Sequence, residues 1–503
     1  MAHLAEKYLR SFLPINYVQI LKFTIKITTM RYLLFLLLVV TASPLMLWGQ
    51  KIEVSDGLSL RNDNGYDIIG RLRDRTLLFR DRFDDYEIQA FDEQLHASWS
   101  RKLEDIDKRN TKILSVLPGK NDFSIIYAQK LKGKYYLKIH KYDPGAILID
   151  SMTIKTYGER LFTPPELEIL ISEDRSKVAV YNTAEKAKLE IICFQVDLMK
   201  VLWDKTASFE EAFMEETFLG LALSNKGILY VALEYDNKKS KIESHRFQIL
   251  QVSEGADVIG KYPFPDAITS DVKFVFDNQN NRLLAGGLWS EKRKERTNGG
   301  FFFSCDPQNP TSYVLKKTYF DEQFVSTIRQ KDVEDGSKGI DDSDVAHLIP
   351  RADGGLAMVV ERHYEIQRGT AGSSRVVREV RNIIDYYYDD FFLLSFGADG
   401  TMQWNTILHK KQYSQDDDGI FSSFFLFKGR ESLQFLFNDE IRYENSCSTY
   451  EVSANGAFDR NSLLNTLNQN LRMRFRDGLQ LSANECLIPS EYRSKLKLVS
   501  IRF

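Results

Sequence analysis

Basic side chains gather in three polar segments of the chain, each of which separates runs of apolar residues. Their cations are Lys238, Lys239, Lys241, Lys292, Arg293, Lys294, Arg296, Arg368, Arg375, Arg378 and Arg381. An Arg guanidinium group binds carboxylate, sulfate or phosphate through two parallel hydrogen bonds. These segments therefore predict recognition of an acidic glycan or another polyanion, although charged loops also serve simply to keep strand edges apart.

Aromatic and imidazole side chains lie beside the last of these segments. Tyr386, Tyr387 and Tyr388 offer faces for stacking, whereas a strand would turn at least one of them into the core. His347 and His363, each with an acid nearby, would act as a general base or metal ligand, although most histidines at strand ends only bind backbone groups. We expect a ligand to contact Lys292, Arg293, Arg296, His363, Arg375, Arg378, Arg381, Tyr386 and Tyr387.

The acidic clusters do not have the pattern of a metal site. Residues 341–344 and 416–418 are rich in Asp, but a calcium loop alternates its carboxylates with other residues, and these clusters do not. The sequence contains no Gly-rich phosphate loop, no nucleophile elbow and no paired Cys spacing. We therefore expect no metal, no cofactor and no catalytic residue set.

Short strands joined by a recurring turn must position all of these residues. An apolar run, an Asp-containing turn and a Trp recur as Phe91-Asp92 to Trp99, Val196-Asp197 to Trp203 and Phe396 to Trp404. Weaker copies lie near Asp143, Glu254, Asp306 and Asn455, so the unit recurs at a spacing of about fifty residues or slightly more. Units of strands and turns of this size bury their apolar faces only by packing around a ring. The pattern predicts an all-β fold of the β-propeller type.

Each unit reads as four short strands, which in the first unit are 66–72, 76–83, 86–91 and 97–103. The second to seventh units begin near Ile113, Ile169, Phe218, Val272, Ala346 and Phe424. Residues 471–476, 485–488 and 495–503 supply three strands of an eighth, and 51–55 supply the fourth, because pairing the two chain ends leaves no unpaired edge. We predict a single eight-bladed propeller domain over 51–503, closed by its N- and C-terminal strands. Seven blades are the alternative if the final segment is only a cap.

Two inserted segments enlarge the sixth unit. Residues 321–343 connect it to the fifth, and residues 365–385 lie between its second and third strands. In an antiparallel blade both kinds of connection emerge at the same end of the ring. The loops 236–245 and 290–299 of the fourth and fifth units are also long. Because long loops on a rigid scaffold commonly carry function, we expect the ligand site at this loop-rich mouth.

The start of the chain has the order of a secretory signal. Arg31, the apolar run 33–40 and the small residues after it follow that order, so we expect a signal peptide over 30–50 and an upstream extension over 1–29. A retained anchor over 32–48 is the alternative, but it is short and contains Pro44. We expect a secreted or periplasmic monomer with no stable membrane span after cleavage.

Composition argues against nucleic acid as a partner. The chain holds 67 Lys and Arg against 70 Asp and Glu, and the expected signal region is basic, so the remainder is acidic. Four cysteines are too few for a disulfide framework. Cys447 and Cys486 lie roughly one repeat apart and would either bridge neighbouring blades or remain buried thiols.

The turn Ala398-Asp399-Gly400 followed by Trp404 resembles the tryptophan-docking repeat of quinoprotein-like propellers, which are typically eight-bladed. The chain also resembles uncharacterised secreted propellers of Bacteroidota. The resemblance implies either a quinone-dependent dehydrogenase or a non-catalytic scaffold, and the dehydrogenases usually carry adjacent cysteines that this chain lacks. We expect Trp99, Trp203 and Trp404 to pack against the next blade.

These observations favour a non-catalytic module that binds a protein or glycan ligand at the loop-rich mouth. The alternative is an enzyme, either a quinoprotein-like oxidoreductase or a glycan-active enzyme, that uses the central funnel with His347, His363 or nearby acids.

Overall fold

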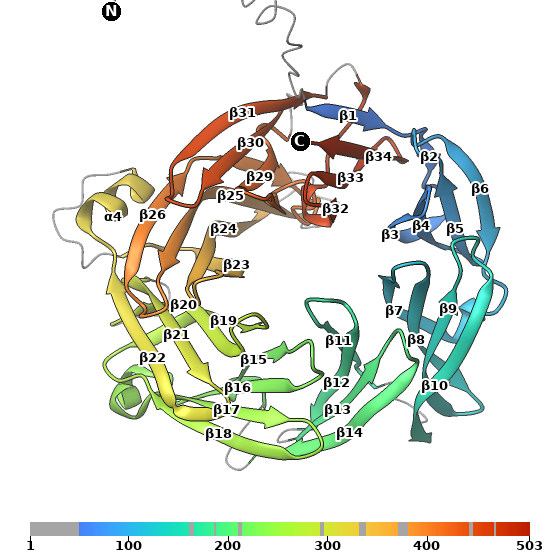
Figure 1. Cartoon of the computed structure of the whole chain (residues 1–503). Coiled ribbons are helices and arrows are strands. Elements are labelled where there is room, and N and C mark those ends of the chain that lie inside the picture. Colours follow the sequence, from blue (N-terminus) through green and yellow to red (C-terminus); the bar gives the residue numbers. More distant parts are fainter. Residues whose placement is uncertain are drawn as a thin grey trace, which may run out of the picture. The chain divides into compact units, whose positions relative to one another are not determined.

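Eight antiparallel sheets stand around a common axis in the computed structural model (Figure 1). The structure describes residues 50–159, 165–185, 188–209, 214–291, 296–330, 339–370, 381–441, 446–466 and 469–503. In each sheet the strand nearest the axis is followed outward by three more, and we call the four strands A to D. This arrangement confirms the eight-bladed propeller and excludes the seven-bladed alternative.

The first four blades are simple meanders. Blade one consists of β3 (Asp63–Leu72), β4 (Arg75–Arg82), β5 (Tyr86–Phe91) and β6 (Ala97–Lys102), and blade two of β7 (Thr111–Pro118), β8 (Phe123–Leu131), β9 (Lys134–Tyr142) and β10 (Leu148–Glu159). Blade three consists of β11 (Glu168–Ile171), β12 (Lys177–Glu185), β13 (Lys188–Gln195) and β14 (Lys200–Ser208), and blade four of β15 (Phe218–Leu223), β16 (Leu229–Tyr235), β17 (Arg246–Val252) and β18 (Ala256–Pro263).

Of the other four blades, six and eight carry an additional strand. Blade five consists of β19 (Ile268–Asp277), β20 (Arg282–Ser290), β21 (Gly299–Asp306) and β22 (Asn309–Tyr319), and blade six of β23 (Ser343–Pro350), β24 (Leu356–Thr370), β25 (Arg381–Phe396) and β26 (Met402–Leu408), with β27 (Gln412–Gln415) paired to β25. Blade seven consists of β28 (Phe424–Lys428), β29 (Ser432–Asn438), β30 (Ser446–Ser453) and β31 (Phe458–Asn465), and blade eight of β32 (Leu479–Ser482), β33 (Glu485–Tyr492), β34 (Lys495–Arg502) and β1 (Lys51–Val54), with β2 (Leu58–Ser59) also on β34.

Closure of the ring takes place in blade eight, where β1 pairs antiparallel with β34, from Lys51 opposite Arg502 to Val54 opposite Val499. Beyond β1 the ladder continues, because the Ser55 N–H donates to Leu498 O and the Leu498 N–H donates to Ser55 Oγ, both at 2.8 Å. The prediction that residues 51–55 complete the last blade is therefore confirmed.

Apolar side chains fill the spaces between neighbouring blades, as the binary pattern of the strands requires. The Trp residues of the D strands join these interfaces. Trp203 Nε1 donates to Gly227 O of blade four at 2.8 Å, and Trp404 Nε1 donates to Ala454 O of blade seven at 3.0 Å. Trp99 packs against the cluster between blades one and two. Their expected role in docking each blade to the next is confirmed.

One predicted strand is wrong. Residues 471–476 alternate buried apolar and basic side chains, but they form only an isolated bridge from Met473 to Ser490 and a 3-10 helix over Phe475–Asp477. Strand A of blade eight is instead β32. Leu471, Met473 and Phe475 are buried although the segment joins no sheet, and its 3-10 helix contacts strands of both blade seven and blade eight.

The insertion in blade six is also more ordered than expected. Residues 365–370 and 381–385, predicted as loop, extend β24 and β25 into a long hairpin, and the three tyrosines lie within β25. Apolar and aromatic residues on both strands favour this extension, and β27 covers the outer edge of β25. Within 321–343 the structure contains helix α4 (Glu322–Arg329), which Asp321 caps by accepting from the Phe324 N–H.

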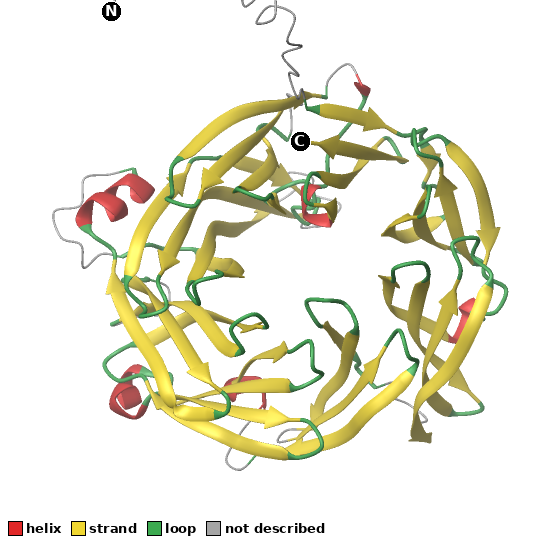
Figure 2. Ribbon diagram, in the orientation of Figure 1, coloured by secondary structure: helices red, strands yellow, loops and turns green. Residues whose placement is uncertain are grey.

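The remaining elements are few and short (Figure 2). Helix α3 spans Met214–Thr217, and 3-10 helices span Lys108–Asn110 and Lys239–Ser244. No helix in the described residues is long and apolar enough to cross a membrane. All four cysteines are buried free thiols, so Cys447 and Cys486 do not bridge. Of the expected extension and signal peptide at 1–50, all but Gln50 falls outside the described residues.

Candidate functional site

A pocket of about 590 Å³ lies against the innermost strands of blades five to eight. We call it the axial pocket. It opens toward the end of the ring where the B–C loops and the connections between blades emerge, which is the mouth predicted to carry function. Its polar lining consists of Lys273, Asp344, His347, Glu361, His363, Tyr388, Lys428 and Arg476.

His347 comes from β23, just after a bulge between Val345 and His347 that turns its side chain toward the pocket. The imidazole is exposed to solvent in the pocket, yet protein surrounds it on most sides. This enclosure, together with the positive charges of Lys273 and Lys428, lowers the pKa of His347 to about 4. His347 is therefore neutral at physiological pH and can donate or accept a hydrogen bond.

His363 and Tyr388 face each other across the β24–β25 ladder. Their rings are stacked, with centroids 5.3 Å apart and planes 16° apart. Nδ1 of His363 lies 3.2 Å from Asp344 Oδ2, so that carboxylate orients the imidazole. Burial raises the pKa of Tyr388, with Arg476 opposing the shift, so its hydroxyl stays protonated.

A buried ion pair supports this wall of the pocket. Lys410 Nζ lies 2.7 Å from Glu361 Oε1 and also donates to the Tyr388 carbonyl oxygen at 3.0 Å. The Ser423 hydroxyl donates to the other Glu361 oxygen at 2.6 Å. Burial lowers the pKa of Lys410, and the Glu361 charge opposes that shift. Lys410 therefore partly compensates the Glu361 charge, which still acts on the neighbouring His347 and Tyr388.

Three cations remain in the pocket, and each comes from a different blade. Lys273 Nζ donates to the Ala346 carbonyl oxygen at 3.0 Å, and Arg476 Nη1 donates to Tyr388 Oη at 3.2 Å and to Gly419 O at 3.3 Å. Lys428 is exposed at the end of β28. Within the described part of the chain, none of the three ammonium or guanidinium groups forms an ion pair. The axial pocket therefore offers positive charge beside neutral hydrogen-bonding groups.

The structure does not bring the predicted site residues together in one pocket. His363 lines the axial pocket, whereas Tyr386 donates to Asp418 at 3.0 Å and Tyr387 stacks on Tyr364 with centroids 4.7 Å apart. Arg296 forms an ion pair with Asp341 at 3.3 Å. Lys292, Arg293, Arg375 and Arg378 lie outside the described residues, and Arg381 begins β25 with a side chain that the structure does not describe.

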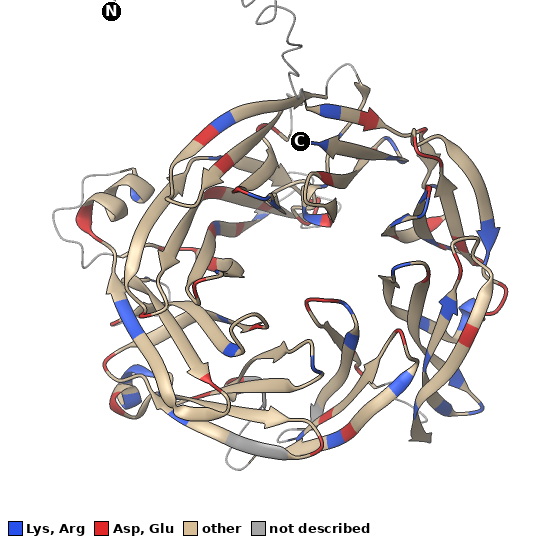
Figure 3. Ribbon diagram, viewed as in Figure 1, with Lys and Arg blue, Asp and Glu red and all other residues tan. Residues whose placement is uncertain are grey.

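Other basic residues of the loops are engaged by acids. Lys241 lies 3.0 Å from Asp236, Lys238 lies 3.6 Å from Glu216, and Arg368 binds Asp385. Figure 3 shows Lys and Arg interspersed with Asp and Glu around the ring. Lys239 donates only to the Glu291 carbonyl oxygen, but most of the described loop cations have acidic partners and do not form a surface of one sign.

The three axial cations were not singled out from the sequence. Lys273 and Lys428 are single lysines in innermost strands of different blades, and Arg476 falls in the segment misassigned as a strand. Only the closed ring brings them to one pocket. The sequence did single out His347 and His363, because both lie in the strands of blade six.

No protein-family model matches the chain, and no curated protein matches it. Among solved structures, it is similar to the polysaccharide lyase Uly1 at 8% identity over 77% of this chain and 89% of that chain, with a TM-score of 0.36. It is similar to dipeptidyl peptidase 4 of Porphyromonas gingivalis at 11% identity over 86% and 56% of the two chains, with a TM-score of 0.39. A protein of unknown function from Bacteroides caccae is similar at 13% identity over 64% and 90%, with a TM-score of 0.28. Similarities of this size concern the propeller fold alone, assign no activity and do not confirm quinoprotein-like repeats.

Proposed function

We propose that the protein is a non-catalytic, secreted or periplasmic propeller that binds an acidic glycan through the axial pocket. The observation that carries the proposal is the convergence of Lys273, Lys428 and Arg476 on one pocket without carboxylate partners among the described residues. Guanidinium and ammonium groups bind uronate carboxylates and sulfate esters strongly where water is partly excluded.

The neutral groups of the pocket favour a sugar over a simple anion. Neutral His347 would hydrogen-bond hydroxyl groups, and the partly exposed Phe425 would pack against the apolar face of a pyranose ring. A volume of about 590 Å³ is within the range of pockets that enclose small organic ligands. A glycan that carries an acidic group together with several hydroxyl groups matches this combination.

The test is the affinity of sulfated and uronate-containing oligosaccharides for the wild-type protein, the variant Arg476→Gln and the double variant Lys273→Gln with Lys428→Gln. We expect each change to weaken binding about tenfold or more, because a charge-assisted hydrogen bond contributes about 1.5 to 3 kcal/mol. The matched control is Lys316→Gln, which removes an exposed charge from β22, the outermost strand of blade five. Equal affinity of all four proteins would exclude the axial pocket.

One observation favours a second candidate, a glycan-active enzyme. His363 is oriented by Asp344 and stacked on Tyr388, and an imidazole held in this way can transfer protons. The same incubations distinguish the two candidates, since release of shorter oligosaccharides by the wild-type protein would establish turnover. Binding without any shortening of the glycan supports the non-catalytic proposal.

A further inference from the structure

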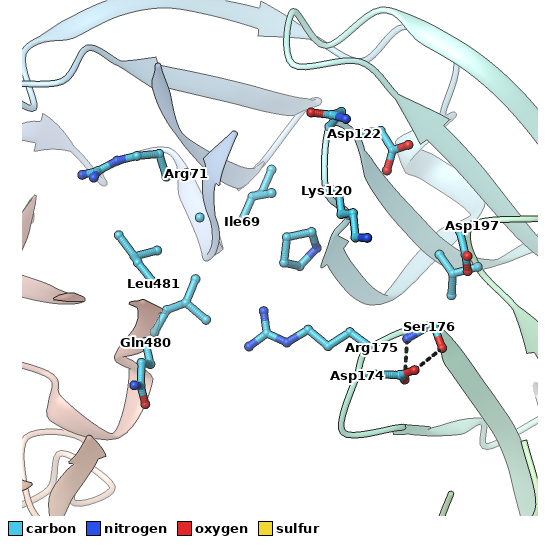
Figure 4. Close-up of a pocket in the computed structure, with 16 residues that line it drawn as sticks. Ile69, Arg71, Lys120, Asp122, Asp174, Arg175, Ser176, Asp197, Gln480 and Leu481 are labelled. Atoms are coloured by element: carbon cyan, nitrogen blue, oxygen red, sulfur yellow. Dashed lines mark hydrogen bonds between the residues drawn. The ribbon is translucent and has the colours of Figure 1, made fainter. Parts of the chain in front are cut away.

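A second pocket, of about 510 Å³, lies at the other end of the ring, between blades one, two, three and eight (Figure 4). The turns between strands A and B of blades two and three form part of its wall, together with the C–D turn of blade three. We call it the A–B pocket. Since A–B turns and B–C loops lie at opposite ends of an antiparallel blade, this pocket is separate from the axial pocket.

Two cations of the A–B pocket, Arg175 and Lys120, form no ion pair with any described residue. Arg71 differs, because it donates to both oxygens of Glu485 at 2.8 and 2.9 Å. Figure 4 shows the Arg175 side chain reaching across the pocket toward Gln480 and Leu481. Its guanidinium group is therefore available to a ligand.

The described carboxylates of this pocket have other partners and form no ion pair with Arg175. Asp174 accepts hydrogen bonds from the hydroxyls of Ser172 and Ser176 at 2.6 and 2.7 Å, and although burial opposes them, these bonds lower its pKa. Asp122 Oδ2 lies 4.0 Å from Lys141 Nζ. Figure 4 places Asp174 and Asp197 on the side of the pocket away from Leu481, toward which Arg175 points. The positive end of the pocket thus adjoins blade eight.

The backbone of Arg175 adopts a left-handed conformation that glycine would also suit. Its φ is 58°, and its N–H closes the A–B turn on Ser172 O. The equivalent residue is Gly227 in blade four and Gly354 in blade six, where the N–H closes the same turn and φ is also positive. An L-residue adopts this left-handed conformation only at an energetic cost that glycine avoids.

Apolar side chains adjoin the guanidinium group. Leu479 and Leu481 of β32 and Pro118 at the end of β7 are partly exposed and line the same pocket. A ligand that satisfies both features carries an anionic group beside an apolar one. Carboxylate fits the forked donors of an arginine, and a short aliphatic group fits the leucines.

We propose that the A–B pocket binds a carboxylate that is carried next to an apolar group, with Arg175 as its main anchor and Lys120 as a second charge. Such a group occurs in acidic peptide segments and in free aliphatic acids. The inference is independent of the glycan site, since the two pockets share no residue.

The decisive variant is Arg175→Gly, measured in the full chain by titration calorimetry. Glycine suits the left-handed turn, so we expect the thermal midpoint to be unchanged while affinity for the carboxylate falls about tenfold or more. The matched control is Arg73→Gly, because Arg73 is also exposed, has a φ of 56° in the A–B turn of blade one and does not line the pocket. Lys120→Gln should produce a smaller loss than Arg175→Gly.

The probes separate the sources of the carboxylate. The acetylated peptide amide Leu-Glu-Leu is compared with Leu-Gln-Leu, and octanoate is compared with octanamide. Tighter binding of the Glu peptide than of octanoate points to a protein partner, and the reverse order points to a free acid. The inference is overturned if the neutral probes bind as tightly as the acids, if Arg175→Gly binds like wild type, or if Arg476→Gln in the axial pocket abolishes binding.

Discussion

His347 is a residue whose protonation changes clearly when the propeller folds around it. The folded protein keeps this imidazole neutral until the pH approaches about 4, whereas an unfolded histidine takes up a proton near 6.5. Below pH 6.5 the unfolded chain binds a proton that the folded chain does not, so the free energy of unfolding falls as the pH drops toward 4. Solvent in the pocket screens the effect, and we expect a loss of about 1 kcal/mol.

The measurement is urea unfolding of the wild-type protein and the variant His347→Gln at neutral pH and at about pH 5. On acidification, the free energy of unfolding of the variant should fall by about 1 kcal/mol less than that of the wild type. A matched control is His96→Gln, because His96 is an exposed histidine of blade one for which no comparable enclosure exists. Parallel pH profiles for wild type and His347→Gln would contradict the interpretation.

Among single residues, the sequence identified those pocket residues that lie within one blade most readily. His347 and His363 were identified because blade six has distinct strands. The cations of the loops were misleading, because Asp341 and Asp385 pair with Arg296 and Arg368 across a loop or hairpin, and sequence spacing does not show such pairing. Arg476 was missed because its neighbour Tyr388 is distant in the chain and adjacent only in the closed ring.

Among the elements, the turns that receive the Trp side chains should be sensitive to substitution. Gly456 has a φ of 85°, and a Cβ added there would lie 2.7 Å from the Trp404 ring. Gly133 has a similar φ of 80° but open space around it. We expect Gly133→Ala to cost about 1 kcal/mol, from the left-handed backbone alone. Gly456→Ala should cost about 2 to 4 kcal/mol, because Trp404 must also move.

Chemical denaturation of the two variants tests this difference directly. Equal losses would show that Trp404 adapts without cost and that its packing on blade seven contributes little. A variant Trp404→Phe, which removes the bond to Ala454 O but keeps an aromatic ring, would separate the hydrogen bond from the packing.

The strands themselves were largely predictable, because the alternation of apolar residues and the repeated turn carry the same information in each blade. The segment 471–476 shows the limit of that reasoning. Its alternation is that of a strand, but Leu471, Met473 and Phe475 are buried outside any sheet, in a segment that contacts blades seven and eight. A binary pattern does not distinguish this burial from burial within a sheet.

The whole molecule depends on β1, the strand that closes it. Deletion of residues 51–55 would remove the ladder to β34 and both bonds between Ser55 and Leu498. We expect the free energy of unfolding to fall by about 3 kcal/mol or more, since several backbone hydrogen bonds of about 1 kcal/mol each are lost. The exposed edge of β34 should also promote association between molecules.

Thermal unfolding and light scattering of the deletion variant test this expectation. Addition of a synthetic peptide that spans residues 50–56 should restore part of the lost stability, and a peptide of the same residues in scrambled order should not. A deletion variant as stable as the full chain would show that the ring does not rely on this strand.

The pairing of β1 with β34 also dictates when the protein can finish folding. Strand β1 is made long before its partner β34, so blades one to seven can assemble while β1 still lacks the inner three strands of blade eight. Joining residues so far apart in the chain makes the final step slow. Until β34 has been made, the nascent protein carries an open seam that a chaperone or a second nascent chain can occupy.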